Sequence, residues 1–468
     1  MVSWVHMAKT QYKLTFCSGA TTVTGADFLL EGPLDESGRP LLRILVDCGL
    51  VQGEKLATEA NWEPFAFDPA TIDYLFITHA HIDHIGRIPK LVHDGFRGKI
   101  IATPPTCALA RPMLLDTAAI LSRDLDHKLD QVYTSEIVDR STTGWTAVDY
   151  GEPFELVPGL TVKFYNAGHI LGSAYVEFML GGTKVVFSGD LGNSPSPILP
   201  DTTPLKDADY LLVESVYGDR LHEARDERRD MLKDVLLENY KKGGTLIIPT
   251  FSLERTQEVI FEIHQMLEEK LIPRMPIYLD SPLAIEITDI YRKQIKYFNP
   301  TIQEHVSRHD DPFIFPGLVV TPEAQDSKNI LKKPDPKVII AGSGMSSGGR
   351  VVHHEHNYLS DPKNTLLLIG YQSVGTLGRK LEDGAKEIAV DRALIPVRAT
   401  IRKISGYSGH KDSDALIAFI ATSKNTLKKV YTVMGEPKST TFLAQRVRNE
   451  LGLAVESPSG GDSVVIDC

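Results

Sequence analysis

The densest set of metal-binding side chains in the chain lies within six residues, His79-Ala80-His81-Ile82-Asp83-His84. Neutral imidazoles and carboxylates supply the nitrogen and oxygen ligands that zinc accepts. A regular strand turns alternate side chains to opposite faces, so it cannot direct all four at one point, but a loop leaving a strand can. Because only 15 histidines occur in 468 residues, this density predicts a metal site rather than a polar loop of chance composition.

Two more candidate ligands follow farther along the chain, each beside a glycine. His169 lies in Ala-Gly-His-Ile-Leu-Gly-Ser, after an expected strand at 161–165, and Asp190 lies in Ser-Gly-Asp, after an expected strand at 184–187. Taken alone, His169 is more often an ordinary loop histidine, and Asp190 could equally be a turn aspartate. Their order after the first cluster makes both of them expected metal ligands.

The ordered motifs HxHxDH, Gly-His and the aspartate of SGD resemble the metallo-β-lactamase superfamily. Asp47, in Leu-Val-Asp-Cys-Gly, matches the early aspartate of that family, which supports the ligand loop. Two metal ions can activate water and stabilise the charge of an in-line displacement. The resemblance implies two zinc ions, the first held by His79, His81 and His169, the second by Asp83 and His84, with Asp190 bridging them.

Later segments have to indicate the substrate, because metallo-β-lactamase enzymes share a fold but not a reaction. Glu214 ends an expected strand, where it can orient a histidine. The glycine-rich run at 342–349 offers backbone N–H groups and hydroxyls to a phosphate, although such a run alone equally fits a flexible turn. His410, in Ser-Gly-His-Lys-Asp, is a loop histidine suited to proton transfer near neutral pH.

Together these segments resemble the β-CASP branch of the superfamily, which includes the endonuclease subunit of the mRNA cleavage and polyadenylation factor, RNase J and Artemis. The resemblance covers nearly the whole chain and is closest to RNA-cleaving bacterial and archaeal members. It implies a catalytic set in which Asp83 directs the attack and His410, oriented by Glu214, protonates the leaving oxygen. It also implies phosphate contacts from Arg255, Ser343, Gly344 and Ser346.

The elements that position these residues define an α/β protein. Mixed strands and helices precede the proline-rich stretch at 195–204, and strand–helix alternation after it predicts a parallel, doubly wound sheet. By the resemblance, the architecture is a metallo-β-lactamase αββα sandwich with an inserted β-CASP α/β cap domain. We expect the first part of the sandwich at 9–205, the cap at 206–395 and the completion of the sandwich at 396–468.

One position departs from the RNA-cleaving pattern. Those members carry a histidine ligand of the second zinc ion in a VHGE-like sequence after a late strand, whereas this chain has Val433-Met434-Gly435-Glu436. A thioether is a poor zinc ligand, so we expect the second zinc site to be weak or empty. DNA-cleaving members also have an apolar residue at this position.

The favoured function is zinc-dependent hydrolysis of RNA phosphodiester bonds in RNA processing or decay. Met434 motivates two alternatives, a DNA nuclease of the same family and a weakly active or non-catalytic RNA-processing subunit, and the six filled ligand positions argue against the second. A small-molecule thioesterase or lactonase is disfavoured by the large cap with Glu214 and His410. Endonucleolytic or 5′-exonucleolytic cleavage stays open, as does formation of a homodimer.

The bulk composition limits partners and compartment. A net charge of −11 argues against a generally basic surface, so attraction to RNA has to come from a local cleft and from bound metal. The four cysteines form no CxxC pair, which fits a reducing cytoplasm. No apolar run is long enough to span a bilayer and the N-terminus lacks the apolar core of a signal peptide, so we expect a cytoplasmic protein with no membrane partner.

Overall fold

The computed structural model describes residues 11–52, 55–122, 131–222, 227–307, 311–370, 372–373, 375–390 and 393–468. The chain divides into two compact units. The first comprises Met1–Ser196, Pro200–Leu221 and Gly409–Cys468, and the second comprises Pro197–Leu199 and His222–Ser408. Within the described part of the chain, no helix is both long and apolar enough to cross a lipid bilayer.

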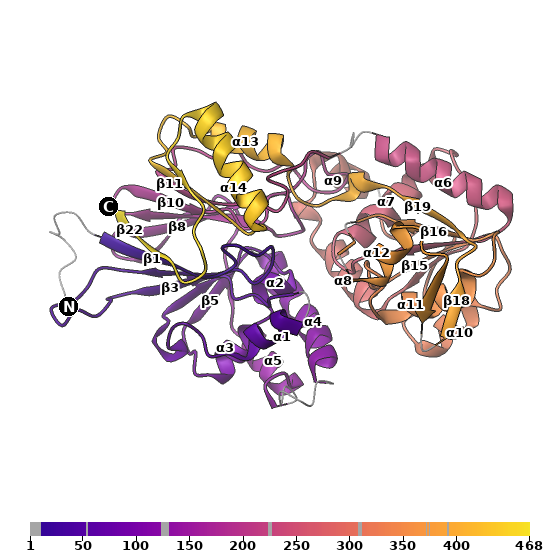
Figure 1. The fold of residues 1–468 in the computed structure, drawn as a ribbon, viewed down its shortest axis with the longest axis horizontal. Coiled ribbons are helices and arrows are strands. Elements are labelled where there is room, and N and C mark those ends of the chain that lie inside the picture. The colour runs from indigo at the N-terminus through magenta and orange to yellow at the C-terminus, as the bar shows by residue number, and fades with distance from the viewer. Residues whose placement is uncertain are drawn as a thin grey trace. The chain divides into compact units, whose positions relative to one another are not determined.

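The first unit contains two seven-stranded sheets (Figure 1). In order across the first sheet lie β22 (Ser463–Asp467), β1 (Gln11–Ser18), β2 (Asp27–Glu31), β3 (Arg43–Val46), β4 (Tyr74–Phe76), β5 (Lys99–Ala102) and β6 (Thr146–Ala147). In order across the second sheet lie β21 (Val455–Glu456), β20 (Lys429–Val433), β11 (Tyr210–Glu214), β10 (Thr183–Phe187), β9 (Ala174–Leu180), β8 (Leu160–Asn166) and β7 (Phe154–Val157).

The two sheets pack face to face around an apolar core. Side chains of a strand alternate between its two faces, and the first half of β1 accordingly alternates exposed and buried residues. The inward faces supply rings such as Phe16, Phe76, Phe178 and Phe187 to one continuous cluster. This shared core holds together strands that are far apart in the sequence.

Helices cover the outer faces of both sheets, as Figure 1 shows. Leu416, Phe419 and Leu443 pack against Tyr175 and Leu211 of the second sheet. The unit is therefore the αββα sandwich that the sequence predicts. The helices over the first sheet are α1 (Lys55–Trp62), α2 (Ile82–Ile85), α3 (Ile88–His93), α4 (Pro104–Leu121) and α5 (Ser135–Thr142), and those over the second are α13 (Ser413–Ala421) and α14 (Pro437–Arg446).

The second unit is built on a six-stranded sheet with every neighbouring pair parallel. Parallel strands require crossover connections, usually helices, so this unit confirms the α/β prediction. Its strands, in order across the sheet, are β14 (Leu318–Val320), β13 (Ile277–Asp280), β15 (Lys337–Ala341), β12 (Thr245–Pro249), β16 (Thr365–Leu368) and β19 (Thr400–Lys403), and β17 (Glu387–Val390) pairs with β18 (Ala393–Pro396) separately. Its helices are α6 (Arg228–Lys242), α7 (Arg255–Glu268), α8 (Pro282–Lys293), α9 (Pro300–Ser307), α10 (Ala324–Ile330), α11 (Gly349–Tyr358) and α12 (Leu377–Glu382).

The main segment of the second unit, His222–Ser408, lies later in the chain than the cap expected at 206–395, whose limits stay a prediction. β11 belongs to the first unit, because it pairs with β10 and β20 and its Leu211 and Val213 fill the core under α13 and α14. β19 belongs to the second unit, because it pairs with β16. The chain thus re-enters the first unit at Gly409, one residue before His410.

Replacing Phe178 with alanine is expected to lower the free energy of unfolding by about 3–5 kcal/mol. The ring is fully buried and packs edge-on against Phe76 and Phe187, with ring centroids 5.0 and 5.6 Å away. Denaturant unfolding followed by circular dichroism measures the loss. Phe442→Ala is the control, since that ring is 43% exposed; an equal loss in both variants would mean that packing between the sheets is not its source.

Candidate metal centre

The predicted metal-binding motif follows the carboxyl end of β4. His79 and His81 lie in the loop after this strand, while Asp83 and His84 lie in α2, a single helical turn. The structure differs here from the sequence prediction, which placed all four residues in a loop, because Asp83 and His84 are helical. Gly49 lies so close to the carbonyl of Asp83 that any Cβ there would clash. This contact explains why the residue two positions after Asp47 is a glycine.

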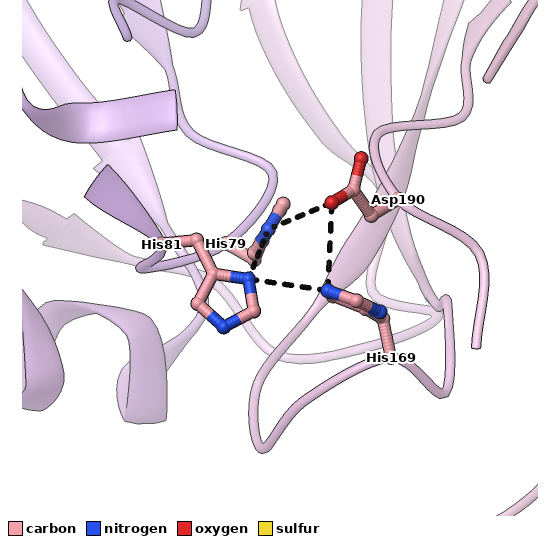
Figure 2. Close-up of side chains that lie close together, drawn as sticks. All are labelled: His79, His81, His169 and Asp190. Atoms are coloured by element: carbon pink, nitrogen blue, oxygen red, sulfur yellow. Dashed lines mark hydrogen bonds and ion pairs between the residues drawn. The ribbon is translucent and has the colours of Figure 1, made fainter. Parts of the chain in front are cut away.

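Four of the predicted ligands form one close group (Figure 2). The Nδ1 atom of His81 lies 3.1 Å from Nε2 of His79 and 3.1 Å from Nε2 of His169. Oδ2 of Asp190 lies 3.5 Å from His79 Nε2 and 3.4 Å from His169 Nε2. Four ligands of a tetrahedral zinc ion, with bonds of about 2.0–2.2 Å, are roughly 3.3–3.6 Å apart, so this donor set and spacing fit one metal ion.

A second group shares Asp190 with the first and adds Asp83 and His84. His84 Nε2 lies 3.3 Å from the other carboxylate oxygen of Asp190, Oδ1, and 3.9 Å from Oδ2 of Asp83. Among the described residues, neither His84 Nε2 nor Asp190 Oδ1 has a hydrogen-bond partner, although both atoms are buried. Unsatisfied buried polar atoms are costly, and a cation between these two atoms would satisfy both.

The charges of the first group also suit a metal. Burial lowers the pKa of His79, His81 and His169, and neighbouring imidazoles lower it further. The three rings are therefore neutral at pH 7, as a metal ligand must be. Burial alone would raise the pKa of Asp190, but the imidazoles of His84, His410 and His79 outweigh it and hold that pKa well below its usual range.

Asp47 fixes the orientation of His84. Its Oδ2 accepts hydrogen bonds from the Thr78 hydroxyl and from His84 Nδ1, both at 2.8 Å, and its Oδ1 accepts from the Thr78 backbone N–H at 2.8 Å. Because Nδ1 donates to Asp47, the Nε2 lone pair of His84 points toward Asp190. Burial lowers the pKa of His84, but Asp190 and Asp47 together raise it well above its usual value, so metal and proton compete for this nitrogen.

The partly exposed His410 and the fully buried Glu214 form a pair beside the same carboxylate. His410 Nδ1 lies 3.2 and 3.3 Å from the two carboxylate oxygens of Glu214, and 3.8 Å from Oδ2 of Asp190. Glu214, at the end of β11, also accepts from the backbone N–H of Leu191. Burial lowers the pKa of His410, but Glu214 and Asp190 outweigh it and raise that pKa to about 9. The structure thus brings together two residues that are 196 positions apart.

Three supporting contacts were not predicted from the sequence. The hydroxyl of Thr78 lies 3.1 Å from Nδ1 of His79, the backbone carbonyl of Gly409 lies 3.0 Å from Nδ1 of His169, and the hydroxyl of Ser173 accepts from the backbone N–H of His169. Ser173 lies within the AGHILGSA segment, four residues after its histidine, and that spacing is the one available signal. The Gly409 contact depends on the return of the chain, which no local pattern reveals.

The predicted phosphate-binding residues lie in the second unit. Ser343, Gly344 and Ser346 share the loop between β15 and α11, and Arg255 begins α7 after the neighbouring strand β12. Their side chains make internal contacts: Ser346 donates to Glu355, Ser343 donates to the carbonyl of Gly348, and Arg255 pairs with Glu258. Within the described residues, no hydrogen bond uses the backbone N–H of Gly344 or Met345, so this loop can offer backbone donors to an anion.

Met434 lies directly after β20, with a left-handed backbone (φ 50°) and only 2% of its surface exposed. Its side chain belongs to the core between the sheets. It also lines a small cavity of about 10 Å³ together with Asp47, Thr78 and His84. Met434 thus lies beside the second ligand group, and the motif resemblance implies a histidine ligand at this position.

Comparison with known families assigns the chain. Family models match residues 42–233 (metallo-beta-lactamase superfamily), 256–381 (Beta-Casp domain) and 394–458 (Zn-dependent metallo-hydrolase RNA specificity domain). The chain is 37% identical to ribonuclease TTHA0252 of Thermus thermophilus, covering 86% of this chain and 89% of that one. It belongs to the β-CASP branch of the metallo-β-lactamase superfamily, as the sequence motifs predicted, and its histidine–aspartate cluster has the donors and spacing to hold a metal ion.

Two further relatives and one solved structure are similar to the chain. An RNase J-like protein of Methanocaldococcus jannaschii is 34% identical, over 90% of this chain and 93% of that one. The transcription termination factor FttA of Methanosarcina mazei is 29% identical, over 97% and 71%. A crystal structure of a protein of unknown function from Enterococcus faecalis V583 has a TM-score of 0.57 at 12% identity, over 98% and 100%, and shares the fold.

Replacing Asp47 with asparagine is expected to weaken binding of divalent metal about 10–100-fold. The amide cannot accept from the Thr78 hydroxyl, the Thr78 N–H and His84 in the way that the carboxylate does, so the His84 ring loses its fixed orientation. Competition with a chromophoric zinc chelator measures the affinity. Asp201→Asn, at an exposed carboxylate, should leave it unchanged. Equal affinity of the Asp47 variant and the unsubstituted chain would contradict the orienting role.

Proposed function

We propose that this chain is a zinc-dependent ribonuclease that hydrolyses RNA phosphodiester bonds. The observation that carries the proposal is the Glu214–His410 pair, 3.8 Å from the carboxylate shared by both ligand groups. A partly exposed imidazole held by a buried carboxylate beside a metal site suits proton transfer to a leaving oxygen. The named ribonuclease among the relatives supports RNA as the substrate.

We assign two zinc ions to the two ligand groups. His79, His81, His169 and Asp190 would hold one, and Asp83, His84 and Asp190 the other. Nitrogen and carboxylate donors without a thiolate are compatible with zinc. When bound, zinc supplies Lewis acidity, which activates water for attack and offsets the negative charge that develops on the phosphate.

The residues of the chain have separate tasks in this scheme. Asp83 accepts the proton of the attacking water and directs the water at phosphorus. His410 donates a proton from Nε2 to the leaving oxygen, while Glu214 holds Nδ1 and stabilises the positive ring. In the second unit, we assign RNA phosphate binding to the loop that contains Ser343, Gly344 and Ser346, mainly through its backbone N–H groups. Arg255 can contribute to phosphate binding only if a phosphate replaces Glu258 as its ion-pair partner.

The test of the function is cleavage of RNA and DNA of the same sequence by the zinc-loaded chain. RNA is expected to be cleaved in preference, and His410→Ala is expected to lower kcat on RNA by about 10²–10⁴-fold with its zinc content kept. Glu214→Gln should reduce kcat by a smaller factor, because the histidine remains but loses its charged partner. Full activity of a zinc-loaded His410→Ala protein would contradict the acid role.

Met434 supports a second candidate, hydrolysis of DNA by the same site. The residue lies beside His84 and Asp47, and the family's RNA-cleaving members have a histidine at the matching position of their motif. A clear preference for DNA in the paired assay would favour this candidate over the ribonuclease. Cleavage of neither polymer by a zinc-loaded chain would favour a non-catalytic subunit.

Replacing Met434 with histidine is expected to tighten binding of the second zinc ion, because an imidazole is a far better zinc ligand than a thioether. Histidine also tolerates the left-handed backbone at this position better than most residues. Zinc per chain, measured by elemental analysis at limiting free zinc, should rise toward two. Met434→Leu keeps an apolar side chain and serves as the control; equal zinc content in the two variants would rule out the ligand role of this position.

A further inference from the structure

A second concave region lies at the end of the first sheet remote from the metal centre. The metal ligands follow the carboxyl end of β4, whereas this cavity lies at the amino ends of β5 and β6. The three strands are parallel neighbours, so their amino and carboxyl ends lie at opposite edges of the sheet. The cavity, of about 290 Å³, is lined among others by Arg97, Lys99, Arg140 and Trp145.

The cavity concentrates positive charge on an acidic protein. Arg97, Lys99 and Arg140 are exposed, and none of them forms an ion pair with another described residue. No described residue that lines the cavity carries a carboxylate. On a chain with a net charge of −11, three cations that lack an ion-pair partner among the described residues form a local site for an anion.

Arg97, two residues before β5, is held in place by hydrogen bonds. Nη1 of Arg97 donates to the backbone carbonyls of Val92 and Phe96, at 3.0 and 2.6 Å. These bonds hold the guanidinium group in the lining of the cavity while its other N–H groups stay available to an anion. Less side-chain entropy is lost on binding when such a donor is held beforehand.

Trp145 adds an aromatic surface to the three cations. Its indole N–H donates to the backbone carbonyl of Ser141 at 2.7 Å, and the side chain is half-buried. This hydrogen bond holds one edge of the ring, so the ring cannot reorient freely. Aromatic rings beside a positively charged groove are the combination that binds single-stranded nucleic acid, because bases stack on the ring and phosphates meet the cations.

We propose that this cavity binds one nucleotide of a single-stranded RNA segment outside the bond that is hydrolysed. The base stacks on Trp145, and the phosphates contact Arg97, Lys99 and Arg140. The inference rests on the proposed function only in taking RNA as the polymer. An acidic protein segment would use the three cations but would leave Trp145 without a role, so the aromatic ring favours RNA.

The test measures binding of a fluorescently labelled oligouridylate by anisotropy at several salt concentrations. All proteins are zinc-loaded and carry His410→Ala, so that the RNA stays intact. Trp145→Ala is expected to weaken binding at least about fivefold without changing the salt dependence, while Trp145→Phe keeps most of the affinity. Arg97→Gln and Arg140→Gln should each reduce the slope of log affinity against log salt by about 0.7. Lys424→Gln, at an exposed lysine in the same unit, is the matched control.

Three results would each overturn the proposal. The first is unchanged affinity in Trp145→Ala, and the second is a slope of log affinity against log salt in the arginine variants equal to that of Lys424→Gln. The third is displacement of the oligouridylate by an equal concentration of uridine monophosphate, which would indicate a site for a free nucleotide. Melting temperatures verify that each variant is folded. Because binding is measured without cleavage, failure of the unsubstituted chain to hydrolyse RNA contradicts the proposed function and leaves the cavity test intact.

Discussion

The metal centre depends on one buried carboxylate that faces imidazoles on three sides. Asp190 directs Oδ2 toward His79 and His169 and Oδ1 toward His84, and His410 lies 3.8 Å from Oδ2. A buried charge is tolerated only when it is paired or coordinates a metal. The surrounding histidines keep the pKa of Asp190 low, so the carboxylate remains charged and holds the two ligand groups together.

Asp190 can occupy this position because the strands of the second sheet converge on it. It follows β10, while Glu214 ends the neighbouring strand β11 and donates its backbone N–H to the Ser188 hydroxyl. Gly189, between Ser188 and Asp190, has φ +51°, and a Cβ there would lie 2.7 Å from Thr78 Cβ. The SGD sequence therefore combines a strand end, a close approach to the loop after β4 and the carboxylate shared by both candidate ligand groups within three residues.

The sequence could predict the candidate ligands because their chemistry is local and dense, whereas the limits of the units and the supporting contacts depend on residues far apart in the chain. Three histidines and an aspartate within six residues indicate a metal whatever surrounds them. The place of β11 in the first unit depends instead on pairing with β20, more than 200 positions away. Apolar strands such as β11 and β12 look alike in sequence, so the pattern alone cannot assign each to its sheet. The contact between the Gly409 carbonyl and His169 cannot be predicted from sequence either, because every residue carries a backbone carbonyl.

Met434, at the position where the motif resemblance implies a histidine, is part of the apolar core between the sheets. Its side chain belongs to the cluster that also contains Phe28, Phe187 and Val433, yet it borders the cavity next to His84. A methionine there contributes apolar burial and fills irregular space, while a histidine would need a polar partner or a metal. Met434 therefore contributes packing between the sheets at the position where the motif resemblance implies a histidine. In the proposed two-zinc site, affinity for the second ion would then rest on Asp83, His84 and Asp190, and thus on the Asp47 hydrogen bonds that orient His84.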